Sequence, residues 1–271
     1  QDKVKAWVSI MYGCNNFCSY CIVPYVRGRE KSRKPGDILA EFRGLVEAGY
    51  KEITLLGQNV NSYGKDLGTG YDFADLLAAL DEISGDYLIR FMSSQPKDAS
   101  FKLFDTMARC SHVAKQLHLP VQSGCDRVLL AMNRPYDKAR YLELITYARK
   151  VMPELVLTSD VIIGFPGETE EQFEDLCNFV KEVKFDRLGC FAYSAEENTV
   201  AARMDGQIEQ EVKDKRAELV MQIQTGIMAQ KQAEKVGQTV RVLCDGIDEE
   251  SGLYLCRTTG DAPEVGGNVC V

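Results

Sequence analysis

The sequence lacks an apolar run long enough to cross a bilayer, and its first residues lack the pattern of a signal peptide. A membrane partner and secretion are therefore not expected. An initiator methionine is also missing, so we expect the sequence to begin inside a longer protein. The ten cysteines are not expected to form disulfides, because the chain has no secretion signal and is far longer than a disulfide-stapled mini-protein. These absences predict a protein of the reducing cytoplasm.

Basic residues are in the minority, with 32 Lys and Arg against 40 Asp and Glu and a formal net charge of −8. This negative net charge does not indicate a nucleic-acid binder, although a local basic patch matters more than the net charge of the whole chain. One patch follows the first cysteines and consists of Arg27, Arg29, Lys31, Arg33 and Lys34. It predicts either contact with a polyanion or an ordinary solvated loop.

Strand-like and helix-like segments alternate six times between residues 5 and 193. The expected strands are Ala6–Met11, Glu52–Leu56, Leu88–Met92, Gln116–Val121, Val156–Ile163 and Leu188–Tyr193. Between them, apolar residues recur three or four positions apart, as in amphipathic helices, and Asp37 and Thr169 stand where helix N-caps are expected. Six βα units predict an α/β fold with a parallel sheet, either open or closed partly into a (β/α)6 barrel. In both forms, function is expected at the carboxyl ends of the strands.

The alternation ends after Tyr193. Residues 207–236 predict a charged amphipathic connector helix. Its apolar stripe, formed by Val212, Leu219, Ile223 and Ile227, is expected to pack on the main domain. Residues 237–271 carry three short strand patterns with a turn at 248–252 and predict a truncated small β-barrel, too short to bury a core of its own. We therefore expect a core domain over residues 1–206, a connector helix over 207–236 and a partial β domain over 237–271.

Three cysteines share one tight loop after the first expected strand. Cys14, Cys18 and Cys21 lie four and three residues apart. Thiolates are the preferred ligands of iron–sulfur clusters, and three of them can hold three corners of a cubane while the fourth iron stays open for a substrate or cofactor. Two alternatives remain: zinc with a fourth ligand from elsewhere, and cysteines that are only buried in the core.

Five longer strings resemble the radical S-adenosylmethionine (SAM) methylthiotransferase family. They are residues 12–21, 27–33, 55–64, 117–124 and 162–169. The resemblance implies a six-unit (β/α)6 partial barrel of the radical SAM type followed by a TRAM-like β domain. It also implies that Cys14, Cys18 and Cys21 ligate one 4Fe-4S cluster, whose open iron binds SAM.

Two branches of the family are represented along the chain. Residues 1–183 resemble the MiaB branch, which methylthiolates isopentenyladenosine next to the tRNA anticodon. Residues 184–271 resemble the RimO branch, which methylthiolates an aspartate in a small-subunit ribosomal protein. The barrel strings favour the anticodon stem-loop of tRNA as the partner. The acidic residues of the last segment favour the ribosomal protein; they are Asp245, Asp248, Glu249, Glu250, Asp261 and Glu264.

The resemblance further implies which side chains contact SAM. These residues are Tyr20, Gly57, Gln58, Asn59, Gln122, Ser123, Asp160, Ile162, Gly164, Glu168 and Tyr193. Two of them have an ordinary structural alternative: Gly164 is typical of a turn, and Asp160 is typical of a hydrogen-bonded carboxylate at a strand end. His118, in the strand expected over residues 116–121, is predicted to be a hydrogen-bonded core residue rather than a catalytic one.

The resemblance also implies a second cluster in an N-terminal methylthiotransferase domain, which we expect to lie outside this sequence. The resemblance implies that the chain alone binds one cluster and cleaves SAM but does not complete sulfur insertion. It also implies an electron donor such as a flavodoxin or ferredoxin. A zinc-binding RNA adaptor without catalytic activity, and another radical SAM reaction such as plain methylation, are the competing interpretations.

Overall fold

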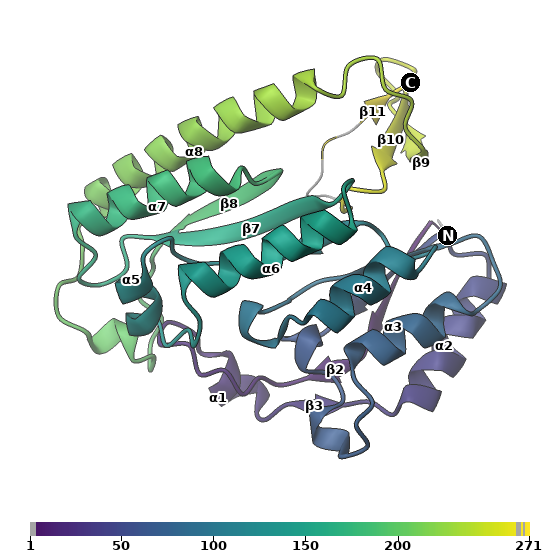
Figure 1. Cartoon of the computed structure of the whole chain (residues 1–271), viewed down its shortest axis with the longest axis horizontal. Coiled ribbons are helices and arrows are strands. Elements are labelled where there is room, and N and C mark those ends of the chain that lie inside the picture. The colour runs from purple at the N-terminus through teal and green to yellow at the C-terminus, as the bar shows by residue number, and fades with distance from the viewer. Residues whose placement is uncertain (1–3, 264–266, 268) are drawn as a thin grey trace.

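Figure 1 shows the computed structural model of the chain, in which residues 4–263, 267 and 269–271 are described. Six parallel strands form two sheets of three: β1 (Lys5–Ser9), β4 (Glu52–Leu56) and β5 (Leu88–Phe91), then β6 (Gln116–His118), β7 (Val156–Ile163) and β8 (Arg187–Ala192). A parallel bridge between Ile89 and Val113 joins them. Neighbours in space follow the order of the chain, as in a partial barrel, so the predicted six-unit α/β fold is confirmed.

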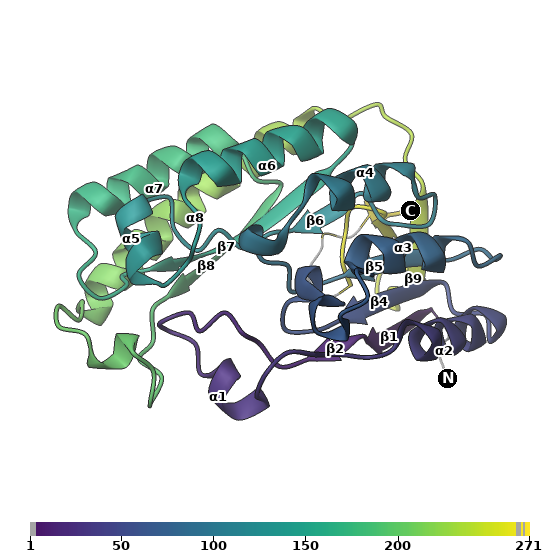
Figure 2. The ribbon, with the colours of Figure 1, turned by 60° about the horizontal axis from the view of Figure 1, so that its bottom comes forward.

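The helices between these strands lie on the outer face of the sheet (Figures 1 and 2). They are α2 (Pro35–Glu47), α3 (Phe73–Asp81), α4 (Phe101–Arg109), α6 (Lys138–Val151) and α7 (Glu170–Val183), and two short helices, α1 (Val23–Arg27) and α5 (Asp126–Ala131), follow β2 and β6. Their apolar stripes and the outward side chains of the strands form one core, in which Val8, Ile53 and Leu117 are fully buried. None of the described helices has the length and apolarity of a membrane span.

Two of the expected strands end early. The expected strand over residues 6–11 is split into β1 and β2 (Met11–Tyr12), and β2 pairs antiparallel with β3 (Lys31–Ser32). The chain turns away because Ile10 O accepts from Arg33 N rather than from a sheet neighbour. β6 ends at His118, since Pro120 has no N–H for the ladder and Val121 N donates to Ser159 Oγ.

One of the two expected helix caps is confirmed. Thr169 forms a capping box with Gln172 at the start of α7. Asp37 does not cap α2, because that helix already begins at Pro35, whose fixed φ suits the first helical position.

The connector helix α8 (Gln210–Ala233) packs differently from the expectation. Val212 and Leu219 are 39% and 45% exposed, so the predicted apolar stripe is wrong at these two positions. The buried positions include Lys213, Arg216 and Gln224. These polar groups reach partners inside the molecule: Tyr193 O at 2.8 Å from Lys213 Nζ, the Glu168 carboxylate at 2.8 Å from Arg216 Nη1, and Phe185 O at 3.0 Å from Gln224 Nε2.

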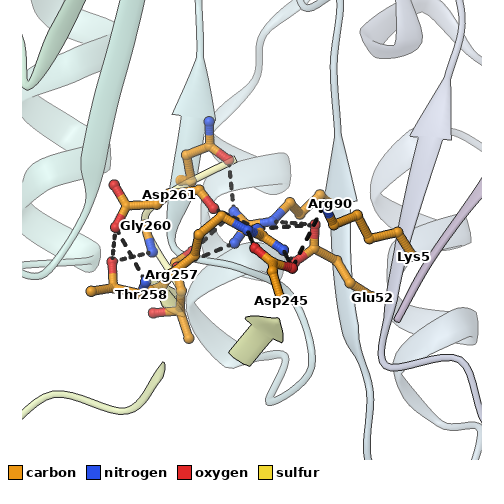
Figure 3. Close-up of polar contacts among 10 residues, drawn as sticks. Lys5, Glu52, Arg90, Asp245, Arg257, Thr258, Gly260 and Asp261 are labelled. Carbon is orange, nitrogen blue, oxygen red and sulfur yellow. Dashed lines mark hydrogen bonds and ion pairs between the residues drawn. The ribbon is translucent and has the colours of Figure 1, made fainter. Parts of the chain in front are cut away.

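The C-terminal sheet has the order β11–β10–β9, formed by β9 (Val242–Ile247), β10 (Tyr254–Thr258) and β11 (Val269–Cys270). It lies at the amino ends of the barrel strands, at the opposite end of the molecule from α1 (Figure 1). Its anchor is Arg257, 2% exposed, whose Nη1 lies 3.0 Å from Glu52 Oε2, while Arg90 donates to Thr259 O at 3.0 Å (Figure 3). The C-terminal sheet is thus held on the barrel by buried charged side chains.

This anchoring predicts acid sensitivity. Hydrogen bonds from Arg257 hold the pKa of Asp245 below its ordinary value. Burial works to raise the pKa of Asp261, but bonds from Thr258 and Arg187 outweigh it and lower that pKa as well. Carboxyls with lowered folded-state pKa values stabilise the fold above their ordinary pKa of 3.8 and lose this contribution as the pH falls through the lower values.

We therefore expect amides of β9 and β10 to lose protection from hydrogen exchange below about pH 4, ahead of β4 and β7. The measurement compares protection factors, corrected for intrinsic exchange rates, at pH 3 and pH 6. Equal protection of the C-terminal sheet at both pH values would contradict this expectation.

Candidate functional site

The three cysteines of the motif lie in the loop that joins β2 to α1 (Figure 2). Cys14, Cys18 and Cys21 line one hollow of about 340 Å3. The loop is shaped by left-handed backbone at Gly13 (φ 77°) and Phe17 (φ 47°), and Cys14 N donates to Gly28 O at 3.1 Å. The tight turn therefore presents three sulfur atoms to the same space.

Two of the sulfur atoms accept hydrogen bonds. Asn16 Nδ2 lies 3.4 Å from Cys14 Sγ, and Arg134 Nη1 lies 3.4 Å from Cys18 Sγ. Arg134 is buried and also donates to Pro120 O at 3.0 Å and to the Tyr136 hydroxyl at 2.9 Å. Donors of this kind stabilise negative charge on cluster thiolates. Sequence reasoning missed Arg134, because nothing in its position along the chain relates it to the cysteines.

Burial raises the pKa of Cys14 and of Cys21, so both thiols favour the neutral form in the apoprotein. A metal ligates the thiolate, and binding therefore releases protons. Among the described residues, no three His, Cys, Asp or Glu side chains converge on a position for a single metal ion. Three cysteine thiols that line one hollow match the ligand type of an iron–sulfur cluster.

The opposite wall of the hollow comes from the carboxyl ends of three strands. Gly57 and Gln58 follow β4, Ser94 and Gln95 follow β5, and Gln122 follows β6. A Cβ at Gly57 would lie 2.6 Å from the Met11 side chain, so this position needs glycine.

Two polar side chains in this wall lack partners. Ser94 and Gln95 are buried, yet Ser94 Oγ and both terminal atoms of the Gln95 amide have no hydrogen-bond partner within the described part of the chain. Buried polar atoms are normally paired. Unpaired donors and acceptors at the edge of a hollow can bind a polar ligand. The amino acid part and the ribose of SAM are polar groups of this kind.

Some of the residues expected at SAM lie with the thiols and some do not. Tyr20, Gly57, Gln58 and Gln122 line the same hollow as the three cysteines. Asn59 and Ser123 are buried behind its wall, where Asn59 Nδ2 donates to Asp98 at 2.6 Å and Ser123 Oγ accepts from Cys125 N at 3.2 Å.

The remaining expected SAM residues lie on β7 and β8 and the loops that follow them. Ile162 and Tyr193 belong to a small apolar cluster that also contacts Tyr20. Gly164 N donates to Glu168 Oε1 at 3.1 Å, and this carboxylate pairs with Arg216 of α8. Asp160 lines a second hollow, separate from the thiols.

Gly13 provides a test of the loop geometry. Its φ is left-handed, and a Cβ there would overlap Arg29 O. We expect Gly13→Ala to cost about 1–3 kcal/mol from backbone strain and to lower iron retention after reconstitution. The matched control is Gly44→Ala in α2, where a Cβ meets open space and where alanine should stabilise by about 0.5–1 kcal/mol. Equal iron content and unfolding temperature in both variants would rule out this account of the loop.

Comparison with known proteins agrees with this geometry. Residues 8–180 match the family model of the radical SAM superfamily, and residues 236–271 match that of the TRAM domain. Among solved structures, coproporphyrinogen III oxidase (HemN) of Escherichia coli, described as a radical SAM enzyme, has a TM-score of 0.58 at 19% identity and covers 84% of this chain and 52% of its own. The similarity to HemN concerns the fold.

Sequence relatives are closer. The tRNA-2-methylthio-N(6)-dimethylallyladenosine synthase of Thermoanaerobacter sp. (strain X514) is 51% identical over 258 residues, which are 95% of this chain and 55% of the relative. The synthase of the same name from Clostridium novyi (strain NT) is 48% identical over all 271 residues, or 60% of its length. Similarity to proteins with this name therefore continues through residues 184–271, for which the sequence predicted a resemblance to the ribosomal-protein branch.

The chain spans little more than half the length of these relatives. The superfamily model nevertheless matches well over half of the chain, and the thiol loop and strand ends that it includes line one hollow. The chain therefore belongs to the radical SAM superfamily.

Proposed function

We propose that this chain is the SAM-binding part of an enzyme that adds a methylthio group to N6-dimethylallyladenosine in tRNA. The observation that carries the proposal is the hollow in which Cys14, Cys18 and Cys21 face the polar carboxyl ends of β4, β5 and β6. The names of relatives about 50% identical to the chain give the reaction and the substrate. The cytoplasm, where tRNA is modified, is the proposed location.

The residues of the hollow suit a cluster with bound SAM. Cys14, Cys18 and Cys21 would hold a 4Fe-4S cluster, which when bound supplies the electron that cleaves the sulfonium of SAM. Asn16 and Arg134 donate hydrogen bonds to the sulfur atoms of Cys14 and Cys18.

Other side chains of the hollow are available for SAM itself. Gln58 and Gln122 offer amide groups, Ser94 and Gln95 offer unpaired polar atoms, and Tyr20 offers an aromatic face. The apolar cluster behind Tyr20, with Phe165 and Tyr193, keeps water from that side. Positioning and exclusion of water are what a protein contributes to cofactor chemistry of this kind.

The complete reaction needs more than this chain provides. We propose that a second cluster, the source of the transferred sulfur, belongs to the part of the relatives' length that this chain does not span. A flavodoxin or ferredoxin is the proposed electron donor.

The charge distribution favours RNA over a ribosomal protein as the substrate. Of the acidic residues that suggested a basic protein partner, Asp245 and Asp261 are paired internally with Arg257 and Arg187, and Glu264 lies outside the described residues. In contrast, Arg27, Arg29, Lys31 and Lys34 are exposed beside the thiol loop, and none of them forms an ion pair within the described residues.

Exposed aromatic rings accompany these cations. Phe17 and Tyr25 meet edge to face, with ring centroids 5.7 Å apart, and Tyr25 is exposed at the surface. Cations and exposed aromatic rings together suit a single-stranded RNA loop, which offers phosphates and unstacked bases.

The test is anaerobic reconstitution of the full-length enzyme with SAM and a reductant, followed by mass spectrometry of two substrates. We expect a methylthio adduct on tRNA that carries N6-dimethylallyladenosine and no adduct on small-subunit ribosomal protein. An adduct on an aspartate alone would replace the proposed substrate by the alternative one. A colourless protein with stoichiometric zinc would favour a non-catalytic RNA adaptor instead.

A further inference from the structure

A second hollow, of about 240 Å3, lies against the sheet of β6, β7 and β8. Its lining includes His118, Asp160, Phe191 and, from the loop after β10, Ala262. The hollow adjoins the thiol hollow along the backbone: His118 stands two residues before Pro120, which lines the first hollow. Asp160 O accepts from Gln122 N, a second residue of that lining, at 2.9 Å.

A histidine and a carboxylate form the polar part of the second hollow. His118 Nε2 lies 3.3 Å from Asp160 Oδ2, and His118 Nδ1 lies 2.9 Å from Thr158 Oγ1. Asp160 Oδ1 has no hydrogen-bond partner within the described part of the chain. A Cβ at Gly189 would overlap this atom, so the glycine leaves room for the carboxylate. His118 therefore holds the Asp160 carboxylate through Oδ2, and Asp160 Oδ1 is available to a ligand.

An aromatic ring forms the apolar part. Phe191 is 56% exposed although it lines the hollow, and Met92 and Leu188 add aliphatic surface. Exposed rings of this kind stack on nucleobases. The volume is below the roughly 300–1,000 Å3 of sites for drug-sized ligands and suits one base with a short alkyl group.

The C-terminal sheet closes this hollow. The loop that contributes Gly260 and Ala262 follows Arg257, and its Asp261 pairs with Arg187 of β8. The buried pairs of Arg257 and Arg90 with Glu52 hold the same loop on the barrel. The wall is thus built from two distant parts of the sequence, and ion pairs hold them together.

We propose that the second hollow receives the flipped-out N6-dimethylallyladenine of the RNA substrate. Phe191 stacks on the base, Asp160 Oδ1 accepts the N6–H, His118 orients the carboxylate, and the alkyl group contacts Met92 and Leu188. Enzymes that modify a nucleobase commonly take it out of its stack in this way. The inference rests on the proposed function and assigns Asp160 to the substrate rather than to SAM.

The test measures discrimination between two RNAs by the full-length, reconstituted protein. The probes are anticodon stem-loops of one sequence, with N6-dimethylallyladenosine or adenosine at the target position, and dissociation constants are measured by fluorescence anisotropy. We expect the unsubstituted protein to prefer the dimethylallyl RNA. Phe191→Ala should reduce affinity for it about tenfold, the size of one base–aromatic stack. Asp160→Leu and Ala262→Phe should reduce the preference as well.

A matched control is Tyr254→Ala, which removes an exposed ring of β10 outside the hollow and should leave the preference unchanged. Phe191→Leu keeps apolar bulk without the aromatic face, so an intermediate loss is expected. Because Phe191 is more than half exposed, its substitution should fold, and the unfolding temperature checks this.

The outcomes separate the two proposals. If the enzyme methylthiolates tRNA but the hollow variants retain the full preference, the inference is overturned while the proposed function stands. If the enzyme binds neither RNA and modifies a peptide aspartate, both are overturned.

Discussion

Replacing Arg257 by methionine is expected to lower the free energy of unfolding by about 3–5 kcal/mol, the usual effect of removing one partner from a buried ion pair. Arg257 is 2% exposed, and its guanidinium lies between Glu52 and Asp245. Without it, Glu52 would keep only Arg90, at 3.2 Å, as an ionic partner in the described residues. Methionine fills similar space but leaves buried carboxylate oxygens without their donor.

The control for this experiment is Arg241→Met in the same C-terminal segment. Arg241 pairs with Asp86 at 3.0 Å, but its side chain is 83% exposed. Exposed pairs contribute about 0–1 kcal/mol, so Arg241→Met should change stability little. Urea denaturation of both variants gives the comparison. Similar midpoints for the two would show that the C-terminal sheet is not held through Arg257.

The second large effect is expected at the thiols. Alanine at Cys14, Cys18 and Cys21 together should abolish the brown colour after anaerobic reconstitution and the release of 5′-deoxyadenosine from SAM, because these variants remove every thiol of the hollow. The control is Cys177→Ala. Cys177 is buried in the core on α7, away from the hollow, and should retain colour and SAM cleavage.

Absorbance and chromatography of the reaction mixture measure both quantities. A colourless Cys177→Ala variant, or a triple variant that still cleaves SAM, would each be incompatible with the assignment. Circular dichroism of the triple variant distinguishes loss of the cluster from loss of the fold.

The sequence predicted most of what periodicity and turn chemistry determine. The bounds of β4 and β7 agree with the expectation, since both strands are rich in β-branched and aliphatic residues. Thr169 and Gln172 identify the start of α7, because a capping box is a local interaction. α8 was predicted less well. Its buried face carries Lys213, Arg216 and Gln224, whose partners lie on other elements, and hydrophobic periodicity does not detect these contacts.

Contacts between distant parts of the chain also limited the prediction of the thiol hollow. Cys14, Cys18 and Cys21 were found from their spacing, and Gln58 and Gln122 from family strings at strand ends. Arg134 and Gln95 were not expected there, whereas Ser94 belongs to a polar strand-end cluster that the sequence does indicate. Arg134 reaches Cys18 from 116 residues away, and the unpaired state of Ser94 and Gln95 depends on which atoms the fold buries. Such long-range placement requires the three-dimensional structure.

The central claim is that three thiolates hold a cubane and leave one iron for SAM. Its most direct measurement is electron paramagnetic resonance of the reconstituted, reduced protein before and after addition of SAM, with iron and sulfide analysis of the same sample. We predict about four iron and four sulfide per chain from this cluster and a spectrum that changes when SAM binds. A spectrum identical with and without SAM, at full iron content, would contradict the claim.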